Sequence, residues 1–304
     1  MSYKTPQETA AAAVVSGARK ANLTWDRALV GGFLAGAFIA FGGLLAITFS
    51  SGLDPKVWGS VPTLLTGLGF SLGLILVVVA GAELLTGNLA LLPLALFQRK
   101  ISLAQLGVNW VLVFVGNLLG SLFVAYFLAY KTGVIGHAAD AAGTAGLEHA
   151  RTVAIVTGKG VTETNYEIFL RAIGCNWLVC LAVWMSISAE DIGGKILAII
   201  FPITGFVAMG FNHVVANMFF LPLGHYIGTP GLGWDDVSRN LLFALLGNIV
   251  GAVVFVAGAY WLMYVRGSAD KEGQEQAPPG TTAKARHDAG APGGDPSDRV
   301  HATS

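Results

Sequence analysis

Long runs without charged side chains divide most of the chain into membrane-length segments. Six such runs cover 28–50, 57–98, 101–130, 172–189, 196–234 and 240–265, and the second is interrupted only by Glu83. The charged stretches between them are short, except for 131–171, which is expected to be a long loop. An α-helix rises about 1.5 Å per residue, so about 20 apolar residues cross the roughly 30 Å hydrocarbon core of a bilayer. The pattern predicts an all-α integral membrane protein with six transmembrane helices.

The second and fifth runs are about twice as long as one span requires, and they share a motif. Residues 81–93 (GAELLTGNLALLP) align with 210–222 (GFNHVVANMFFLP), and 116–120 (GNLLG) with 247–251 (GNIVG). Three spans in each half place the halves in opposite orientations, as in many transporters and channels. We therefore expect an aquaporin-like 3+3 inverted repeat with broken second and fifth helices, and a pore between the halves.

The ends of the chain differ in composition from the membrane region at 28–265. Residues 1–27 contain a short Ala-rich run, which predicts a cytoplasmic or interfacial N-terminal helix. Residues 266–304 are rich in Gly, Pro, Ala and mixed charges, which predicts a disordered cytoplasmic tail. An even number of spans places both termini on one side, and the distribution of Lys and Arg favours the cytoplasm.

Composition excludes several classes of function. Hydrophobic residues make up 54% of the chain and charged residues 12%, whereas about a quarter of an ordinary soluble domain is charged. Lys plus Arg and Asp plus Glu both total 18, so no basic surplus exists for binding nucleic acid. Cys175 and Cys180 fit packing positions, with neither a disulfide nor a metal site indicated. Without a metal, cofactor or catalytic motif, an enzyme has little support.

Glu83 and His213 are the most exceptional residues within the apolar runs, because ionisable groups at membrane depth usually face a cavity or a partner. His225, near a membrane face, is expected to be a surface residue. His213 is the candidate centre of a pore, because an imidazole donates hydrogen bonds and titrates near pH 6.5. Asn176, in the fourth span, either orients this ring or forms a hydrogen bond between helices. Glu83 is expected to cap the backbone of the broken second helix.

The breaks in the second and fifth runs have their own candidate residues. Gly87 favours local unwinding, and the short side chains of Asn88, Asn212 and Asn217 can satisfy the backbone groups that unwinding frees. The ends of broken helices present backbone N–H groups that attract an anion without a lysine in lipid. The alternative interpretation is a kink that serves only packing.

Four motifs together resemble the formate/nitrite transporter family of bacterial anion channels. They are 70–76 with 81–88 for the second helix, 176–186 for the fourth, 206–218 for the fifth and 247–251 for the sixth. The resemblance covers approximately residues 6 to 265. It implies an aquaporin-like fold in the bacterial inner membrane, assembled as a homopentamer with one pore through each protomer.

The resemblance also implies roles for individual residues. It places Thr86 on a broken-helix loop beside the pore, His213 at the pore centre with Asn176 nearby, and Lys159 in the outer vestibule. Pore constrictions correspond to Phe70, Leu74 and Phe206. The sequence departs from the family at Asn212, where many members have glutamate, and this changes the charge beside His213.

The function expected from the sequence is transport of a small monovalent anion of a weak acid through a proton-linked pore centred on His213. Formate is the expected substrate, with nitrite or hydrosulfide as alternatives within the family. A neutral-solute pore of the aquaporin type is a further alternative, although the two Asn-Pro-Ala loops typical of it are absent. The other is a membrane scaffold or sensor whose tail binds a partner.

Overall fold

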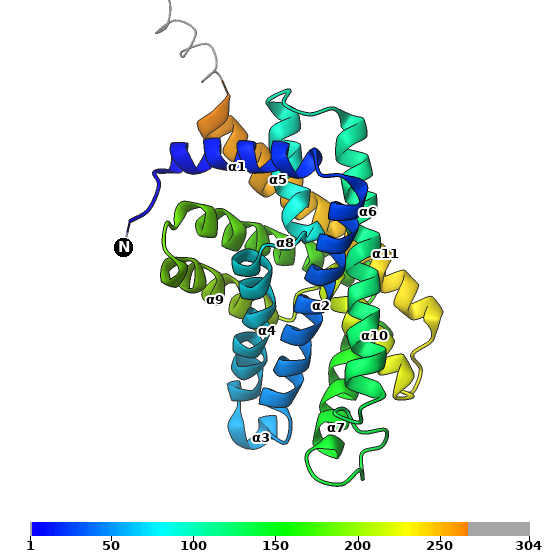
Figure 1. Ribbon diagram of the computed structural model, residues 1–304. Coiled ribbons are helices and arrows are strands. Elements are labelled where there is room, and N and C mark those ends of the chain that lie inside the picture. Colours follow the sequence, from blue (N-terminus) through cyan, green and yellow to red (C-terminus); the bar gives the residue numbers. More distant parts are fainter. Residues whose placement is uncertain (1, 267–304) are drawn as a thin grey trace, which may run out of the picture. The chain divides into compact units, whose positions relative to one another are not determined.

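The computed structural model describes residues 2–266, and the predicted tail from residue 267 onward lies outside the described residues. The described part is built from helices, among them short π-helical segments that carry the symbol η (Figure 1). In chain order they are α1 (Pro6–Ala21), α2 (Trp25–Ser50), α3 (Pro55–Trp58), α4 (Val61–Ala80), α5 (Leu85–Phe97), α6 (Leu103–Phe123), η1 (Val124–Tyr130), α7 (Ala145–Val156), η2 (Thr157–Thr162), α8 (Asn165–Ser188), α9 (Ile192–Ala208), α10 (Val214–Tyr226), α11 (Trp234–Ala252), η3 (Val253–Gly258) and η4 (Trp261–Val265).

Within the described residues, 5 helical stretches are long and apolar enough to cross a membrane; they are Trp25–Ser50, Val61–Ala80, Leu103–Tyr130, Asn165–Ser188 and Trp234–Val265. The two overlong runs are divided as their length predicts. The second run forms α4 and the shorter α5, and the fifth forms α9 and α10. The predicted helical membrane fold with broken second and fifth helices is therefore confirmed.

Each broken helix is interrupted at the glycine that opens the repeated motif. Gly81 follows α4 with a φ of 82°, and Gly210 follows α9 with a φ of 70°. Left-handed backbone of this kind is readily adopted by glycine and disfavoured for residues with a Cβ atom. The repeated glycine thus ends the longer helix of each pair, and an irregular link leads to the half-helix α5 or α10.

Two predicted spans begin earlier in the structure than the uncharged runs do. Helix α8 begins at Asn165 instead of residue 172, and α11 begins at Trp234 instead of residue 240. In α8 the Thr164 hydroxyl accepts a bond from the Glu167 N–H and the Glu167 carboxylate accepts one from the Thr164 N–H. Such reciprocal capping stabilises a helix start that contains charges, so counting charges places these starts too late.

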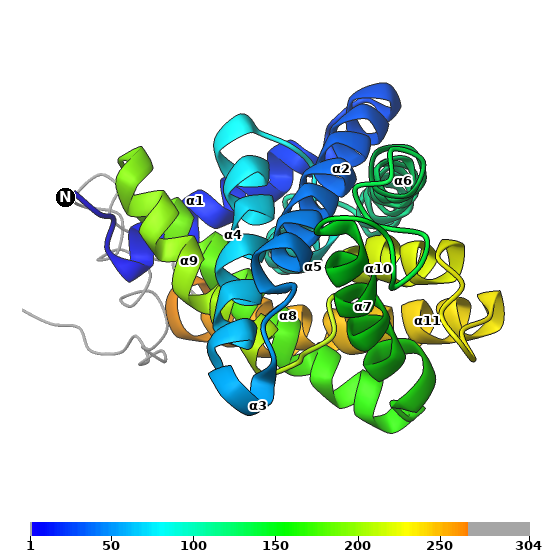
Figure 2. The same ribbon diagram turned by 90° about the horizontal axis from the view of Figure 1, so that it is seen from below.

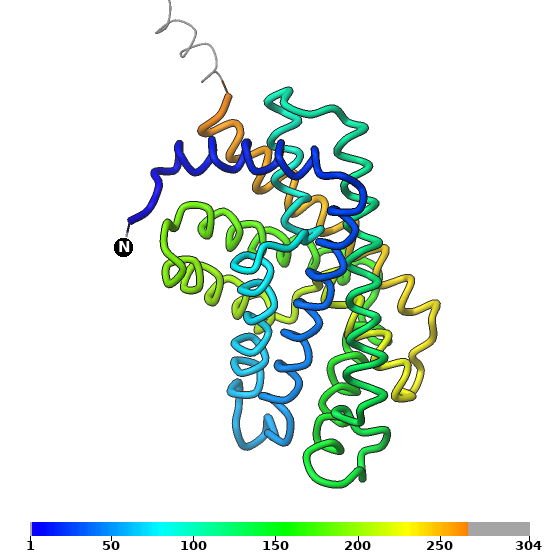
Figure 3. Tube along the Cα trace, viewed as in Figure 1, coloured from blue at the N-terminus to red at the C-terminus, as the bar shows by residue number. Residues whose placement is uncertain are grey.

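The two halves pack in the same way. Helix α2 packs against α4 and α6, and α8 packs against α9 and α11. In the view from below, α2 lies between α4 and α6 (Figure 2). The half-helices α5 and α10 follow their longer partners in each half, as the chain trace shows (Figure 3). This correspondence matches the inverted repeat expected from the motifs.

Glycines allow the closest helix contacts in both halves. A Cβ atom on Gly120 of α6 would lie 2.0 Å from the Phe33 carbonyl oxygen of α2, and one on Gly251 of α11 would lie 2.4 Å from that of Ile173 in α8. Small residues let helix backbones approach in this way in membrane proteins. The repeated Gly-Asn-x-x-Gly motif is therefore a packing motif in addition to a marker of the repeat.

Replacing Gly120 with alanine is expected to destabilise the protein by about 2 kcal/mol or more, because the added methyl group overlaps a backbone oxygen that cannot rotate away. Gly107 is the matched control on the same helix, since a Cβ atom there meets nothing within 4 Å. Gly107→Ala should be neutral or stabilising by up to about 1 kcal/mol. Thermal unfolding of both variants in detergent measures the difference, and equal melting temperatures would contradict the packing argument.

A helix precedes the first span of each half. Helix α1 begins with a capping box, in which hydrogen bonds from the backbone N–H and the hydroxyl of Thr5 lower the pKa of Glu8. It packs against α5, and its last turn carries Lys20. In the second half, α7 and η2 precede α8, and η2 carries Lys159. The region of α7 was expected to be a long loop, so the repeat is more extensive than the uncharged runs indicate.

Candidate functional site

Two cavities follow one another along α4. The first, the Lys159 cavity, has a volume of about 210 Å³, and the second, the Lys20 cavity, about 370 Å³. Thr63, Thr66 and Phe70 of α4 line the first, and Leu74, Val77 and Val78 line the second. Further lining residues of the Lys159 cavity are Arg151, Lys159, His213 and Asn217, and of the Lys20 cavity Lys20, Glu83, Gly87 and Asn88.

An apolar junction separates the cavities, and no residue that lines one lines the other. The rings of Phe70 and Phe206 lie edge to face with centroids 5.8 Å apart, and Phe206 stacks on the His213 ring at 5.9 Å. All three side chains and Leu74 are buried. The structure thus brings Phe70 and Phe206, two of the three predicted constriction residues, to His213, and Leu74 lines the Lys20 cavity.

The two half-helices meet at this junction. Thr86, in the first turn of α5, has its Oγ1 atom 2.9 Å from Nε2 of His213, the residue that caps α10. The Nδ1 atom of His213 accepts a hydrogen bond from the Ala216 N–H at 3.0 Å. A neutral ring that accepts at Nδ1 carries its proton on Nε2, so we infer that the imidazole donates to the Thr86 hydroxyl.

One asparagine in each half fixes the start of the half-helix. Asn117 accepts from the Leu85 N–H at 2.9 Å and donates to the carbonyls of Gly32 and Glu83 at 2.7 and 2.9 Å. In the second half, Asn248 accepts from the Val214 N–H at 2.9 Å. It donates to the carbonyls of Ala172 and Asn212 at 2.8 and 3.0 Å. Both asparagines are fully buried, and each replaces the partners that the helix break removes.

Glu83 does not cap the broken helix as expected. Its carboxylate accepts hydrogen bonds from Lys20 Nζ at 2.9 Å and from Asn88 Nδ2 at 3.0 Å, both side-chain donors. Asn117 takes the backbone N–H at the start of α5 instead. A carboxylate within an apolar region is stabilised by a paired cation, and Lys20 supplies that charge from the end of α1.

Asn176 forms hydrogen bonds between helices, one of the two roles expected for it, and none to the His213 ring is found among the described residues. Its Nδ2 atom donates to the carbonyl oxygens of Thr86 and Asn248 at 3.2 and 2.8 Å. Asn176 therefore positions Thr86, the residue that contacts the imidazole, through a hydrogen bond between helices. Cys180 donates to the same Thr86 carbonyl from the next turn of α8.

The remaining broken-helix residues lie around these centres. Asn88 donates to Asn109 at 3.0 Å, and Asn217 donates to Asn240 at 2.7 Å, so the pairing recurs in both halves. In both Asn88 and Asn217 the Oδ1 atom is buried without a hydrogen-bond partner. A Cβ atom added to Gly87, in the first turn of α5, would meet only Val183, at 3.6 Å. Gly87 therefore leaves space next to Thr86 in the sequence.

Lys159 reaches the break before α10. Its Nζ atom donates to the Phe211 carbonyl at 2.9 Å and to Oδ1 of Asn212 at 3.2 Å. The Asn212 Nδ2 atom donates at 2.6 Å to Glu163, which pairs with Arg171. Glu163 and Lys20 were missed because they lie outside the uncharged runs. Lys20 could have been found from the sequence, because it and Lys159 are similarly placed, each shortly before the first span of its half.

The arrangement suits the passage of a small polar solute. The N-terminal ends of α5 and α10 both face the junction, and helix N-termini favour negative charge. The buried rings of Phe70 and Phe206 disfavour a bare ion, because desolvation of a charge is costly. Among residues 2–266, no group of three or more His, Cys, Asp or Glu residues that could hold a metal occurs.

Sequence comparison relates the chain to membrane transporters. A family model described as formate/nitrite transporter matches residues 7–262. The uncharacterized transporter YrhG of Bacillus subtilis is 46% identical over 264 residues, covering 87% of this chain and 95% of the relative. The formate channel BtFdhC of Bacillus thuringiensis is 40% identical and covers 87% and 97%. The nitrite transporter NirC of Salmonella typhimurium is 36% identical and covers 75% and 80%.

Solved structures show the same fold. One described as an FNT family ion channel is similar with a TM-score of 0.73 at 32% identity, covering 84% of this chain and 98% of that chain. A second, described as a pentameric formate channel with formate bound, has a TM-score of 0.66 at 31% identity and covers 80% and 98%. These relatives are channels and transporters, not enzymes.

Proposed function

Because the chain belongs to the formate/nitrite transporter family, we propose that it conducts a small monovalent anion of a weak acid, formate first, through a proton-linked pore centred on His213. The observation that carries this proposal is the apolar junction of Phe70, Phe206 and His213 between two cavities that each contain a lysine. Such a junction rejects a bare charge and admits a small neutral molecule.

The proposed passage has three steps. The anion enters the Lys159 cavity, where the Lys159 ammonium and the N-terminal end of α10 attract it. It then takes up a proton at the junction, either from water on the entry side or from His213 after the imidazole has itself been protonated from that side, and crosses the ring pair as the neutral acid. In the Lys20 cavity the acid releases its proton and leaves as the anion. Thr86 orients the imidazole throughout, since its hydroxyl lies 2.9 Å from Nε2.

Formate is favoured as the substrate by two of the relatives, since one is a formate channel and one structure contains bound formate. Nitrite is the alternative within the same family, because another relative is a nitrite transporter. Hydrosulfide remains a third small monovalent anion of a weak acid. All three fit the proposed passage, since each has a neutral protonated form.

The proposed surroundings follow from the helix surfaces and from a structural relative. Large apolar side chains of α6 are exposed in the isolated chain, among them Val108 and Val111 at 59% and 63%. Lipid or neighbouring copies of the chain cover such a surface, and the pentameric relative favours a homopentamer. We place the chain in a bacterial inner membrane with cytoplasmic termini, residues 28–265 as its pore domain, and 1–27 and 266–304 as cytoplasmic segments.

Uptake into liposomes tests the proposal. The uptake rates of formate, nitrite, hydrosulfide and glycerol into liposomes that contain the purified protein are compared under an inside-alkaline pH gradient. Formate uptake that rises as the outside pH falls is the expected result, because the proposed passage takes up one proton per anion from outside by way of His213. Faster nitrite or hydrosulfide uptake would change the substrate within the family. Glycerol passage without anion uptake would overturn the proposal in favour of a neutral-solute pore.

Replacing Phe206 with alanine is expected to widen the junction and to raise the uptake of acetate relative to formate several-fold, because discrimination by pocket size alone amounts to about 1–3 kcal/mol. Phe201→Ala is the matched control on the same helix, since Phe201 is 76% exposed and Phe206 only 2%. The control should retain the original ratio. An unchanged ratio in Phe206→Ala would mean that the ring pair does not select solutes by size.

A further inference from the structure

The first half neutralises its cavity lysine by direct contact. Lys20 Nζ lies 2.9 Å from both carboxylate oxygens of Glu83, and the side chains of both residues are 15% exposed. Asn88, five residues further along, donates to the same carboxylate at 3.0 Å. The cation and the carboxylate therefore form a pair of zero net charge at the mouth of the Lys20 cavity.

The second half has an amide where the first has this carboxylate. Asn212 matches Glu83 in the repeat, and its Oδ1 atom accepts from Lys159 at 3.2 Å and from Asn217 at 3.0 Å. The two donors are the counterparts of Lys20 and Asn88. The acceptor geometry is thus retained while the negative charge is absent from position 212.

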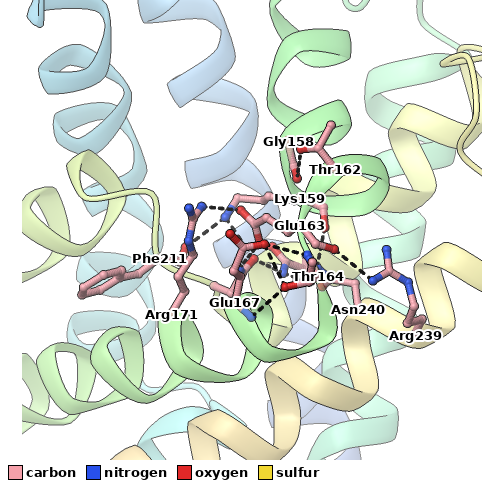
Figure 4. A network of polar contacts seen from close by, with 12 residues as sticks. Gly158, Lys159, Thr162, Glu163, Thr164, Glu167, Arg171, Phe211, Arg239 and Asn240 are labelled. Carbon is pink, nitrogen blue, oxygen red and sulfur yellow. Dashed lines mark hydrogen bonds and ion pairs between the residues drawn. The ribbon is translucent and has the colours of Figure 1, made fainter.

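The carboxylate of Glu163, from another segment, binds the NH₂ end of the Asn212 amide. Glu163, which follows η2, accepts from Asn212 Nδ2 at 2.6 Å, and its other oxygen pairs with Arg171 at 2.7 Å (Figure 4). Its side chain is only 7% exposed. Within residues 2–266 this carboxylate forms its ion pair with Arg171, and no ion pair joins it to Lys159.

We propose that Glu163 is a positioning residue for the pore: it fixes the orientation of the Asn212 amide and so holds Lys159 at the cavity without neutralising it by contact. The two ends of an amide are similar in size, so their orientation is set by hydrogen-bond partners. An ionised carboxylate only accepts, so Glu163 requires the NH₂ end of Asn212 and turns Oδ1 towards Lys159. A reversed amide would point donors at an ammonium group.

The arrangement makes the two cavities electrically different. Lys20 and Glu83 cancel in contact, which leaves Arg19 as the one net positive charge lining the Lys20 cavity. The charged residues lining the Lys159 cavity leave two net positive charges; they are Arg151, Lys159, Glu163 and Arg171. Arg151 lines the same cavity, hydrogen-bonded to Ser50 and Thr66 at 2.8 and 2.9 Å. The Lys159 cavity is therefore the more positive of the two and concentrates anions. Its carboxylate, that of Glu163, contacts Asn212 and Arg171 instead of the lysine. The transport side of this inference rests on the proposed function.

Moving the carboxylate back tests the inference. Asn212→Glu alone places a carboxylate against that of Glu163, so anion uptake should fall about tenfold and the melting temperature should drop, in the range of coupling expected for contacting groups. Adding Glu163→Gln removes the clash and lets the carboxylate introduced at position 212 pair with Lys159 as Glu83 pairs with Lys20. The double variant should recover most of the lost stability, whereas its anion uptake should stay low, because Lys159 is then neutralised by contact.

A second double variant is the matched control. Asn212→Glu with Glu167→Gln has the same net charge, but the exposed Glu167 only caps Thr164 on α8 and does not contact Asn212. It should stay as impaired as Asn212→Glu. Equal rescue by both, or additive losses in the Glu163→Gln pair, would overturn the inference.

Glu163→Gln alone gives an independent readout. A glutamine side chain both donates and accepts, so it no longer dictates the Asn212 amide, and the KM for formate should rise several-fold with little change in the maximal rate. An unchanged KM would contradict the positioning role. If the wild-type protein carries no anion, the proposed function fails, while the melting temperatures of the variants still test the contact between residues 163 and 212. If Asn212→Glu does not fold, a double variant less stable than Glu163→Gln overturns the inference.

Discussion

Replacing His213 with phenylalanine is expected to lower proton-driven formate uptake about a hundredfold and to abolish its pH dependence, the usual scale for loss of a positioned acid–base group. The imidazole is the titratable group that lies against both Phe206 and Thr86 at the junction. A phenyl ring fills similar space between the cavities but has neither a proton to exchange nor a hydrogen bond for the Thr86 hydroxyl. Initial uptake rates at several outside pH values measure the change.

His213→Asn separates proton exchange from helix capping. In the native chain the imidazole accepts the Ala216 N–H at the start of α10, and losing such a cap costs about 1 kcal/mol. Asparagine is also a good N-cap residue, so this variant should be as stable as the wild type and yet lose the pH dependence. Native pH dependence in both variants would rule out His213 as the proton relay.

The sequence predicts the membrane scaffold well, because hydrophobic length decides it. A run of twice the needed length can only bend or break. The second run breaks at Gly81 and the fifth at Gly210. The repeat predicts that α5 and α10 occupy equivalent positions. The starts of α8 and α11 were placed too late, because Asn165 and Trp234 begin helices whose first turns carry charges.

The contacts of the polar residues were less predictable. His213, Thr86, Phe70 and Phe206 do meet, since their motifs resemble one family closely and the half-helices bring them together. The partners of Glu83 and Asn176 could not be derived from spacing, because each is supplied by a distant segment. Apart from the similar placement of Lys20 and Lys159, a charged residue outside the uncharged runs gives no sign, in one sequence, that it folds back into the membrane region.

Asn248→Leu is expected to destabilise the protein by about 2–4 kcal/mol and to stop transport, since two buried backbone groups at the break lose their partner at about 1–3 kcal/mol each, less the gain from burying leucine. The groups are the Val214 N–H and the Asn212 carbonyl, whereas the Ala172 carbonyl keeps its bond within α8. The two groups flank His213 in sequence, so the start of α10 and the imidazole are released together.

Asn117→Leu is the internal comparison for this variant, because Asn117 makes the equivalent three bonds in the first half. It should lower the melting temperature by a similar amount, and Leu242→Ala, at a side chain of α11 that is 54% exposed, should not. Unequal losses at positions 117 and 248 would show that one break is held by other contacts. Equal losses would establish that each half of the pore depends on one asparagine, since without it the broken helix has no partner for the groups that the break exposes.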